Sequence, residues 1–476
     1  MDKETIYSHL PVSMQNAVTS LVGYRLKRRR YDVGFKRMFE RVRARESLNG
    51  IELRRYQEKR LKENLEFVRH ASPFYDAYLK KHRIDLEKGY LIEQIAELPI
   101  LRKQDVKEQV EAIHPKEKGK EAWISCHTSG TTGSGLVFYE TKSSEQERWA
   151  TWWRYRHWHG IGFDTWCGYF GGRSLVALDQ KKPPYWRINA PGKQWMFSAY
   201  HLNGETAVHY VKKLKQSKVP WIHGYPSVLS LLAGYILEQK LDPGNEIRII
   251  TTGAESLLEH QRQIIEEAFG VRVRQHYGQA ESVANISECE FGKLHVDEDY
   301  SLVEFVPLEG NVYRIVGTGF INPVFFLLRY DTGDTVTLED EQCACGRPGR
   351  IVKSIDGRIE DYVVLPDGTK IGRLDHIFKD CVNIREAQIV QETLERITIQ
   401  VVKGANYTPA DEAQLLAESR KRLGNEVKLT VRYVDEIPKT RSGKLRLVVS
   451  RLQDHPTRER KVDHEPNPAK LTERSH

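Results

Sequence analysis

The run TSGTTGSG at residues 128–135 has the composition of a loop that holds phosphate. Its three glycines let the backbone turn tightly and approach an anion, and its hydroxyl and amide groups can donate hydrogen bonds to phosphate oxygens. The run stands between two strand-like stretches, WISC and LVFYE, and it lacks the GxxxxGK[ST] spacing of a Walker loop. The sequence therefore predicts a phosphate-binding loop of another class between two strands.

Two carboxylates follow other strand-like runs, where a nucleotide could bind. Glu281 ends the run YGQAE after the strand-like VRVRQH, and a carboxylate there can hold Mg²⁺ on phosphates. Asp334 ends the run YDTGD after the strand-like FFLLRY, and a carboxylate at a strand end suits the two hydroxyls of a ribose. Taken singly, each run could be a surface turn.

Two basic motifs come later in the chain. DGR at residues 356–358 stands where the sequence passes into a smaller unit, and KTRSGK at residues 439–444 is a glycine-hinged loop that offers lysines. A flexible lysine such as Lys444 can stabilise an anion that develops on a transferring phosphate or carboxylate. The five motifs in this order favour one nucleotide-dependent reaction.

The ordered set TSGTTG, YGQAE, YDTGD, DGR and SGK resembles the motifs of the adenylate-forming superfamily of acyl-CoA synthetases, nonribosomal adenylation domains and luciferases. The resemblance extends over residues 90–452. Within the superfamily, the chain is most similar to the phenylacetate–coenzyme A ligase family, and closest to members associated with capsular polysaccharide biosynthesis. The stretches that carry this similarity are HGYPSVLSLLA, TTGAESL, FKDCVNIREAQIVQ and IPKTRSGKLRLV.

The resemblance implies a ligase that reacts in two steps. A small carboxylic acid attacks the α-phosphorus of ATP, which gives an acyl-adenylate and pyrophosphate; the smaller domain then rotates, and an acceptor takes the acyl group. The acceptor could be coenzyme A, or an amine or hydroxyl on a sugar or lipid-linked precursor. The alternatives are an adenylyltransferase that stops at AMP transfer and a catalytically silent nucleotide-binding scaffold. The intact SGK loop argues against the scaffold.

The resemblance also assigns roles to residues of this sequence. Glu281 would coordinate Mg²⁺, and Lys444 would bridge the carboxylate and the α-phosphate. Asp334 would bind the ribose hydroxyls with help from Arg358, and Glu360 or Asp361 would be the hinge. The residues that would hold the β- and γ-phosphates are Thr128, Ser129, Gly130, Thr131, Thr132 and Gly133. The other nucleotide-binding residues would be Gly253, Ala254 and Glu255 in the adenine pocket, Tyr277 stacked on the base, and Gly278.

Four residues form a candidate metal site: Cys289, His295, Cys343 and Cys345. CxCG is a turn in which backbone N–H groups can face thiolates, and Cys289 and His295 are spaced as a returning turn would be. Three cysteines and one histidine make a tetrahedral structural zinc set. The alternative is four unrelated residues. Because some members of the phenylacetate ligase branch carry a similar cluster, the resemblance favours a structural Zn²⁺ that ties two segments of the large domain.

The acyl site is less clearly marked. Residues 149–163 are dense in aromatics, and five of them fall at helical spacings. They indicate either a buried helix or one wall of the acyl site. Arg173 or His223 could face a polar substrate, although His223 could equally be a hydrogen-bonded core residue. The five residues at helical spacings are Trp149, Trp152, Trp153, Arg156 and His159.

The stretch from residue 24 to 45 is rich in Arg and Lys with interleaved apolar residues. It predicts either a helix that makes peripheral contact with a membrane surface or a partner, or an ordinary solvated helix face.

The remaining sequence sets the elements that must position these groups. With 476 residues, 39% hydrophobic residues and a net charge of +8, the chain can bury large cores and favours anionic ligands without requiring a nucleic acid. Six cysteines, an N-terminus without a signal peptide and the lack of an apolar run of about 20 residues indicate a cytoplasmic protein, monomeric or homodimeric. We expect a large N-terminal multilayer α/β domain and a small mobile C-terminal α+β domain. The expected boundaries are a helical segment at 1–90 packed on the large domain, the rest of that domain at 91–356, the small domain at 357–452 and a disordered tail at 453–476.

Overall fold

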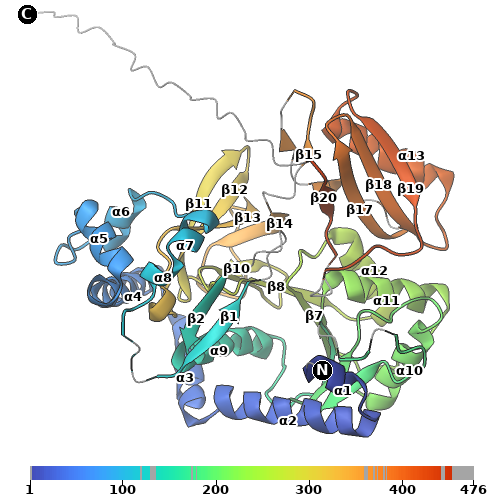
Figure 1. Cartoon of the computed structure of the whole chain (residues 1–476), viewed down its shortest axis with the longest axis horizontal. Coiled ribbons are helices and arrows are strands. Elements are labelled where there is room, and N and C mark those ends of the chain that lie inside the picture. Colours follow the sequence, from blue (N-terminus) through green and yellow to red (C-terminus); the bar gives the residue numbers. More distant parts are fainter. Residues whose placement is uncertain are drawn as a thin grey trace, which may run out of the picture.

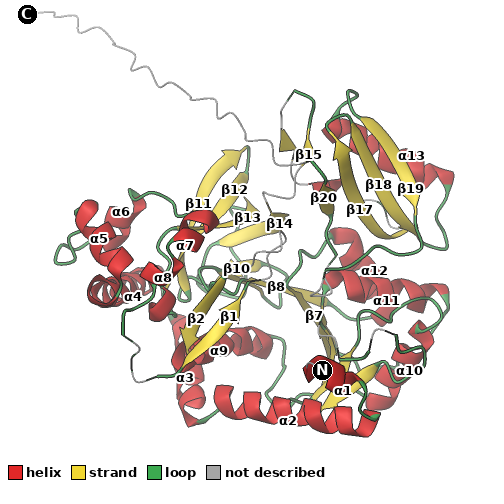
Figure 2. Cartoon of the chain, viewed as in Figure 1, coloured by secondary structure: helices red, strands yellow, loops and turns green. Residues whose placement is uncertain are grey.

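The computed structural model describes residues 3–117, 119, 121–128, 136–172, 175–177, 179–358, 363–367, 370–371, 374–378, 381, 383–440 and 445–452 (Figure 1). A large α/β body is built around a twelve-stranded sheet, and a smaller α+β body stands beside it (Figures 1 and 2). The mixed α/β architecture agrees with the prediction. The predicted tail at residues 453–476 lies outside the described residues.

The N-terminal part is helical, as predicted. Asn49 begins the longest of its helices with a capping box, in which its side chain accepts from the backbone of Glu52 while the Glu52 carboxylate accepts from the Asn49 N–H. Pro73 occupies the first position of the next helix, where its missing N–H costs nothing. The helices here are α1 (Lys3–Ser8), α2 (Val12–Arg30), α3 (Val33–Ala44), η1 (Arg45–Ser47), α4 (Gly50–Ala71), α5 (Pro73–Lys81), α6 (Leu91–Ala96), α7 (Lys103–Glu108) and α8 (Val110–Ile113).

The basic stretch at residues 24–45 is two helices and not one. α2 ends at Arg30, and Asp32 caps α3 by accepting a hydrogen bond from the Phe35 N–H at 3.0 Å. The apolar face of α3 is buried through Phe35, Phe39 and Val42. Lys36, Arg37, Arg41 and Arg43 are exposed on the rest of α3, as the interpretation of a solvated helix face expects, and the apolar face packs into the core.

One half of the large sheet is parallel, as the strand–helix alternation predicts, except that its edge strand β4 runs antiparallel to β5. β3 pairs with β5 and β6, β6 with β7, and β7 with β8, all in parallel. The strands of this half are β3 (Cys167–Phe170), β4 (Trp186–Asn189), β5 (Gln194–Phe197), β6 (Trp221–Gly224), β7 (Ile249–Gly253) and β8 (Val273–Gly278).

Side chains of these strands alternate between two helical layers, because successive residues of a strand point to opposite faces. On β6, Ile222 faces the core beneath α10 (Ala207–Ser217), α11 (Pro226–Glu238) and α12 (Glu259–Phe269). Trp221 faces the opposite core, formed with α3 and α9 (Lys142–Trp158). The second face is the one on which the cavity described below lies.

The other half of the sheet is antiparallel, which the sequence did not predict. From β8 onward, each neighbouring pair runs in opposite directions, in the order β8-β9-β10-β14-β13-β12-β11. These strands are β9 (Asn285–Glu288), β10 (Leu294–Val296), β11 (Ser301–Glu309), β12 (Val312–Gly319), β13 (Tyr330–Leu338) and β14 (Ile351–Arg358).

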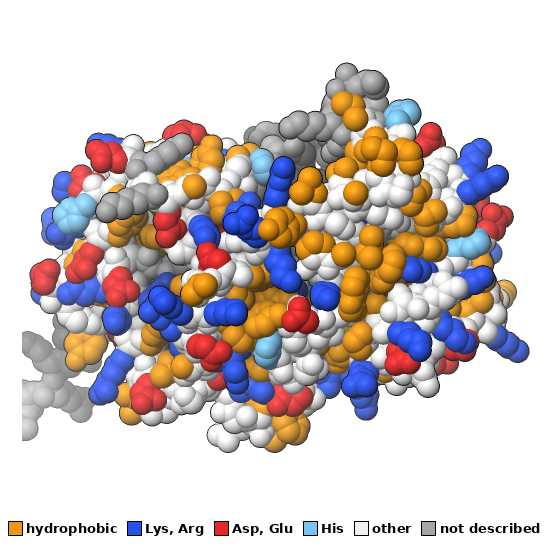
Figure 3. Space-filling model, turned by 90° about the horizontal axis from the view of Figure 1, so that it is seen from below, with side chains coloured by type: hydrophobic (Ala, Val, Ile, Leu, Met, Phe, Trp, Pro, Cys, Tyr) orange, Lys and Arg blue, Asp and Glu red, His pale blue; other side chains and the backbone are white. Residues whose placement is uncertain are grey.

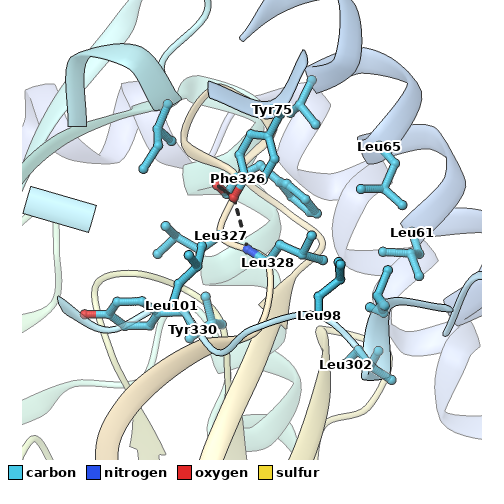
Figure 4. Packing of buried hydrophobic residues seen from close by; sticks show 14 of the residues in the cluster. Leu61, Leu65, Tyr75, Leu98, Leu101, Leu302, Phe326, Leu327, Leu328 and Tyr330 are labelled. Atoms are coloured by element: carbon cyan, nitrogen blue, oxygen red, sulfur yellow. Dashed lines mark hydrogen bonds between the residues drawn. The ribbon is translucent and has the colours of Figure 1, made fainter. Parts of the chain in front are cut away.

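The run FFLLRY is not a strand, contrary to the expectation. It follows the short helix η2 (Pro323–Phe325), and β13 begins only at Tyr330, so that Asp334 lies within a strand and not after one. The apolar side chains of the run are buried together under α4 and α5 (Figure 4). Tyr75 fixes the backbone there, since its hydroxyl donates to the Phe326 carbonyl at 2.8 Å and accepts from the Leu328 N–H at 3.2 Å. Consecutive side chains of this run are all buried, whereas a strand with one solvated face would alternate between buried and exposed side chains.

The smaller body has its own core. Its four-stranded sheet has the order β19-β18-β17-β20, and one helix covers it with buried side chains such as Leu415 and Leu423. The elements after β14 are β15 (Val363–Val364), β16 (Lys370–Ile371), η3 (Leu374–Phe378), β17 (Ile384–Thr393), β18 (Arg396–Lys403), α13 (Pro409–Leu423), β19 (Lys428–Tyr433) and β20 (Val448–Ser450).

Among the described residues, no helix is both long enough and apolar enough to cross a membrane.

Candidate active site

The predicted phosphate loop connects two paired strands. β1 (Trp123–His127) and β2 (Val137–Thr141) form an antiparallel hairpin, as expected from WISC and LVFYE. Thr128 closes its base, since its N–H donates to the Leu136 carbonyl and its Oγ1 accepts from the Leu136 N–H, both at 2.9 Å. The rest of the predicted phosphate contacts, Ser129, Gly130, Thr131, Thr132 and Gly133, lie outside the described residues.

Three parallel strands end side by side at one edge of the sheet. Gly224 of β6 pairs with Thr252 of β7, and Gly253 of β7 pairs with His276 of β8. A Cβ atom at Gly253 would lie 3.2 Å from the His276 carbonyl oxygen, so that glycine permits the close approach. Ala254 follows in the left-handed region with φ of 68°. The predicted adenine-pocket residues thus lie at carboxyl strand ends, where open α/β sheets bind ligands.

Glu255 connects the large body with the smaller one. Its carboxylate accepts from the Ser227 N–H in the first turn of α11 and from the Leu445 N–H, each at 3.2 Å. Lys444 lies outside the described residues. Its neighbour Leu445 donates a hydrogen bond to Glu255, which is a predicted nucleotide-binding residue. The chain that carries the predicted lysine therefore reaches the same edge of the sheet.

The carboxylates of Glu281 and Asp334 each accept a hydrogen bond from a tyrosine. The Tyr277 hydroxyl donates to Asp334 Oδ2 at 2.7 Å, and the Tyr330 hydroxyl donates to Glu281 Oε1 at 3.4 Å. Burial, together with the Asp334 carboxylate, raises the pKa of Tyr277 well above its usual value, so the phenol stays a donor. Arg358 pairs with Asp334 through the backbone register of β13 and β14.

These groups could hold a magnesium nucleotide. Glu281 follows Gly278 by three residues beyond the end of β8, and a carboxylate oxygen is the hard donor that Mg²⁺ requires. The structure thus brings Tyr277, Glu281, Asp334 and the Arg358 backbone together. The individual roles of these residues stay predictions.

A cavity of about 660 Å³ continues inward from this edge. Its volume lies in the range of small-molecule sites, and aromatic side chains dominate its wall. At one end it reaches Gly224, Gly253, Ala254 and Gly278. The wall elsewhere is formed by α2, α3, α9 and the strands β3 to β8, including Gly23, Leu26, Tyr31, Trp149, Trp152, Trp153, Tyr155, Arg156, Tyr169, Asn189, Met196, Trp221, His223 and His276.

The aromatic stretch at residues 149–163 is a core helix, as one interpretation expects, and it also lines a cavity, whose use as the acyl site stays a prediction. α9 packs aromatics into the core, and Trp149, Trp152 and Arg156 also line the cavity. His159 does not line it and is held by the Glu288 carbonyl at 2.9 Å. Arg173 lies outside the described residues.

His223 lines the cavity as a neutral group. One ring nitrogen, Nδ1, lies 2.8 Å from Thr251 Oγ1. Burial, with the Arg156 charge, lowers the pKa of His223 to about 3, and the same two causes lower the pKa of His276 to about 3. Both imidazoles are therefore uncharged at neutral pH.

Helix α2 contributes to the cavity wall, which sequence reasoning missed. Gly23 lets the helix lie against β4, since a Cβ there would meet Asn189 Oδ1 at 1.8 Å. A glycine inside a helical stretch was the available signal of close approach. Lys27 and Lys36 also line the cavity, and Figure 3, which views the molecule from the α2 side, shows Lys and Arg gathered around apolar surface. Peripheral membrane contact of this region stays a prediction.

The candidate metal residues do converge. The four ligand atoms of Cys289, His295, Cys343 and Cys345 lie within 4.8 Å of one another. Cys289 Sγ is 3.6 Å from Cys343 Sγ, and Cys345 Sγ is 3.3 Å from His295 Nε2. Tetrahedral zinc with sulfur ligands at 2.3 Å separates its ligand atoms by about 3.7 Å. The cluster therefore has the donors and the spacing that a structural Zn²⁺ needs.

The chain is similar in sequence to a family model and to two known proteins. A family model described as the CapK C-terminal domain matches residues 363–451. Over 460 residues the chain is 30% identical to Protein CapK of Staphylococcus aureus, which covers 94% of this chain and 99% of that protein. Over 351 residues it is 27% identical to the phenylacetate–coenzyme A ligase of Thermus thermophilus, covering 67% of this chain and 73% of that enzyme.

A solved structure shares the fold. A 2-hydroxyisobutyryl-CoA ligase in the postadenylation state, in complex with R3-HIB-AMP, matches with a TM-score of 0.66 at 19% identity. The match covers 85% of this chain and 91% of that chain. The predicted fold class is confirmed by this match.

Proposed function

Since the chain belongs to the CapK branch of the adenylate-forming superfamily, we propose that it is an ATP-dependent, AMP-forming ligase that activates a carboxylic acid as its acyl-adenylate. The predicted resemblance is confirmed by these relatives. The observation that carries the proposal is the edge of the sheet at which Gly253, Ala254 and Gly278 line the cavity. The carboxylates Glu255, Glu281 and Asp334 lie in the segments that continue from this edge or hydrogen-bond to it. A nucleotide held at that edge would face an acid held in the cavity.

In the first step, a carboxylate oxygen bonds to the α-phosphorus of ATP, and the bond from that phosphorus to the bridging oxygen breaks. The products are the acyl-adenylate and pyrophosphate, and no covalent bond to the protein is needed. Asp334, supported by the Tyr277 hydroxyl, would bind the ribose hydroxyls. Glu281 would hold Mg²⁺, which screens the phosphate charges. Lys444 would stabilise the anion that develops between the carboxylate and the α-phosphate.

In the second step, an acceptor would take the acyl group and release AMP. For coenzyme A, the thiol sulfur bonds to the acyl carbon, the mixed anhydride bond breaks, and the thiol proton is lost. Coenzyme A is the acceptor we propose, because the phenylacetate–coenzyme A ligase and the 2-hydroxyisobutyryl-CoA ligase among the relatives carry it in their names. An amine or hydroxyl acceptor is the alternative, and a role in polysaccharide biosynthesis would accord with the CapK relative.

We also propose that the Cys/His cluster binds a structural Zn²⁺. The cluster joins the end of β9 and β10 to the segment before β14, which are distant in sequence. A bound Zn²⁺ would cross-link these segments without taking part in the reaction.

The adenylation proposal is tested by pyrophosphate release with ATP and Mg²⁺ across a panel of carboxylic acids. We expect release to depend on the acid and to fall about 100-fold or more in Lys444→Ala, since preorganised charge of this kind contributes several kcal/mol. Lys428→Ala, which removes an exposed lysine of the same body, is the matched control and should retain activity.

The assay also separates the acceptors. Thioester formation on addition of coenzyme A would support the ligase, whereas pyrophosphate release that never leads to acyl transfer would favour the adenylyltransferase. Equal release by wild type and Lys444→Ala would contradict the proposed mechanism.

A further inference from the structure

Arg156 is a cation in the cavity with no anionic partner among the described residues. Its guanidinium carbon lies 4.8 Å from the Trp153 ring centroid, 5.1 Å from that of Trp221 and 5.5 Å from that of Trp149. The side chain belongs to the cavity wall. Three indole faces therefore hold the charge in place without neutralising it.

Other buried arginines of the same helix are paired. Arg148 donates to Glu140 at 2.6 Å, and Arg154 donates to Asp297 at 2.7 Å and to Asp299 at 2.8 Å. Burial alone would lower the pKa of Arg154, but the two carboxylates raise it above the usual value. Burial lowers the pKa of Arg156, and the groups that oppose this are only tyrosines and a cysteine.

The rest of the described cavity wall does not supply a compensating anion near Arg156. His223 and His276 are neutral, as argued above. The one carboxylate that lines the described wall is Asp164, which is exposed at the surface. Lys27 and Lys36 are exposed and also line the cavity. The cavity therefore has a half-buried positive charge that a ligand can neutralise, and partial burial of a charge costs less when an anion pairs with it.

Arg156 contacts the cavity wall at the opposite end of β6 from the nucleotide edge. It packs on Trp221 at the start of β6, whereas the cavity meets the nucleotide edge at Gly224, three residues further along the strand. At about 3.3 Å per residue, that separation is about 10 Å. Arg156 is thus placed to bind the far end of an acid and not its reacting carboxylate.

We infer that the acid that this site activates carries a second anionic group, a carboxylate, phosphate or phosphonate, which Arg156 binds at the end of the cavity beside Trp221. The inference rests on the proposed adenylation and names the substrate class for that site. The spacing of Trp221 and Gly224 along β6 sets the scale of the separation, so a diacid of about six carbons is a suitable first probe. Arg156 is therefore a substrate-binding residue that determines specificity.

Acid pairs of equal length test this inference. The probes are hexanoate, adipate and 5-phosphonopentanoate, each with ATP and Mg²⁺, and pyrophosphate release gives kcat/KM. We expect wild type to prefer one of the dianionic acids to hexanoate by about 30- to 100-fold, the range of a charged hydrogen-bonded pair. The better of the two dianions shows whether the second group is a carboxylate or a phosphonate-like group.

The variants separate binding from folding. Arg156→Gln should lose the preference, mainly through a higher KM for the dianions, and Arg156→Lys should keep part of it. Arg43→Gln removes an exposed arginine that lies over the Phe39 ring and does not line the cavity, so it should keep the full preference. Calorimetric titration with AMP verifies that each variant is folded.

The outcomes distinguish the two proposals. Equal kcat/KM for hexanoate and both dianions in wild type would overturn the inference and leave the adenylation standing. If no acid supports pyrophosphate release, the dianions are titrated alone by calorimetry. Binding that depends on Arg156 would then support the inference while contradicting the proposed function. Binding that is the same in Arg156→Gln, or no binding by either dianion, would overturn the inference.

Discussion

Two polar regions lie on either side of α9, and they handle charge in opposite ways. In the closed region, formed by Arg45, Glu147, Arg154, Asp297 and Asp299, each side chain hydrogen-bonds or ion-pairs with another member of the set. In the cavity, two residues along the same helix, Arg156 lies over three Trp rings and has no carboxylate partner in the described part of the chain. Arg154 thus stabilises the fold through ion pairs, whereas the charge of Arg156 is available to a ligand.

The difference lies in what surrounds each arginine. Asp297 is itself held by Asn285 at 2.6 Å and by Ser287 at 2.7 Å, so the closed region is a network whose members fix one another. The closed region also adjoins the Cys/His cluster, since His295 and Arg154 line one small cavity. In the closed region, the arginines and carboxylates already pair with one another, so a ligand has no unpaired charge to bind. In the cavity, an anionic ligand can pair with Arg156.

The largest effect should come from breaking the closed network. Arg154→Met would leave the buried Asp297 without a cation and Asp299 with Arg45 alone, and we expect a loss of about 3–5 kcal/mol in the free energy of unfolding. Arg156→Met removes only cation–π contacts, and we expect a loss of about 1–2 kcal/mol or less. Urea unfolding followed by circular dichroism compares the two. Similar losses would mean that Arg156 is structural and would remove the contrast between the regions.

An intermediate effect should follow removal of the proposed zinc. Cys345→Ser should abolish a metal content of one Zn²⁺ per chain and reduce the free energy of unfolding by about 2–4 kcal/mol, as loss of a cross-link between distant segments does. Elemental analysis measures the metal, and urea unfolding measures the stability. Cys381→Ser, at a buried cysteine outside the cluster, is the control for metal content. Zinc that persists in Cys345→Ser would contradict the proposed site.

The smallest effect should appear with pH in the cavity. The pKa of His223 is about 3 in the folded protein against about 6.5 when unfolded, so the unfolded state takes up the proton first as pH falls. The stabilisation from the neutral ring is complete above pH 6.5 and decreases toward pH 3. At pH 5 the loss is roughly 2 kcal/mol. His223→Gln should reduce the slope of the stability profile between pH 7 and 5 by this share, while the share of His276 remains. An unchanged slope would show that the pKa of His223 is not lowered in the fold.

Much of the candidate site could be predicted because its residues lie in short sequence motifs. The phosphate-loop hairpin, Glu281 beyond β8 and the converging Cys/His residues all follow from glycine spacing and donor types. The run FFLLRY was misassigned because a fully apolar run fits a buried loop as well as a buried strand.

The cavity wall was harder to foresee. Spacing placed Arg156 on a helix face, but only the fold shows that no described carboxylate faces it. The part played by α2 depends on the close approach of Gly23 to Asn189, and the helices α3 to α9 and the strands β1 to β3 separate these two residues in sequence.

The attachment of the smaller body has a consequence for how it would move. Glu238, at the end of α11, binds Arg385 of β17 at 3.1 Å and the Ala405 N–H at 2.9 Å, while Glu255 binds Leu445. The apolar core of the smaller body is formed by its own residues alone. Release from the large body would therefore break a few polar contacts without exposing that core, and dissolved salt would compete for the ion pair. Ionic strength should thus shift the balance between the docked and released arrangements.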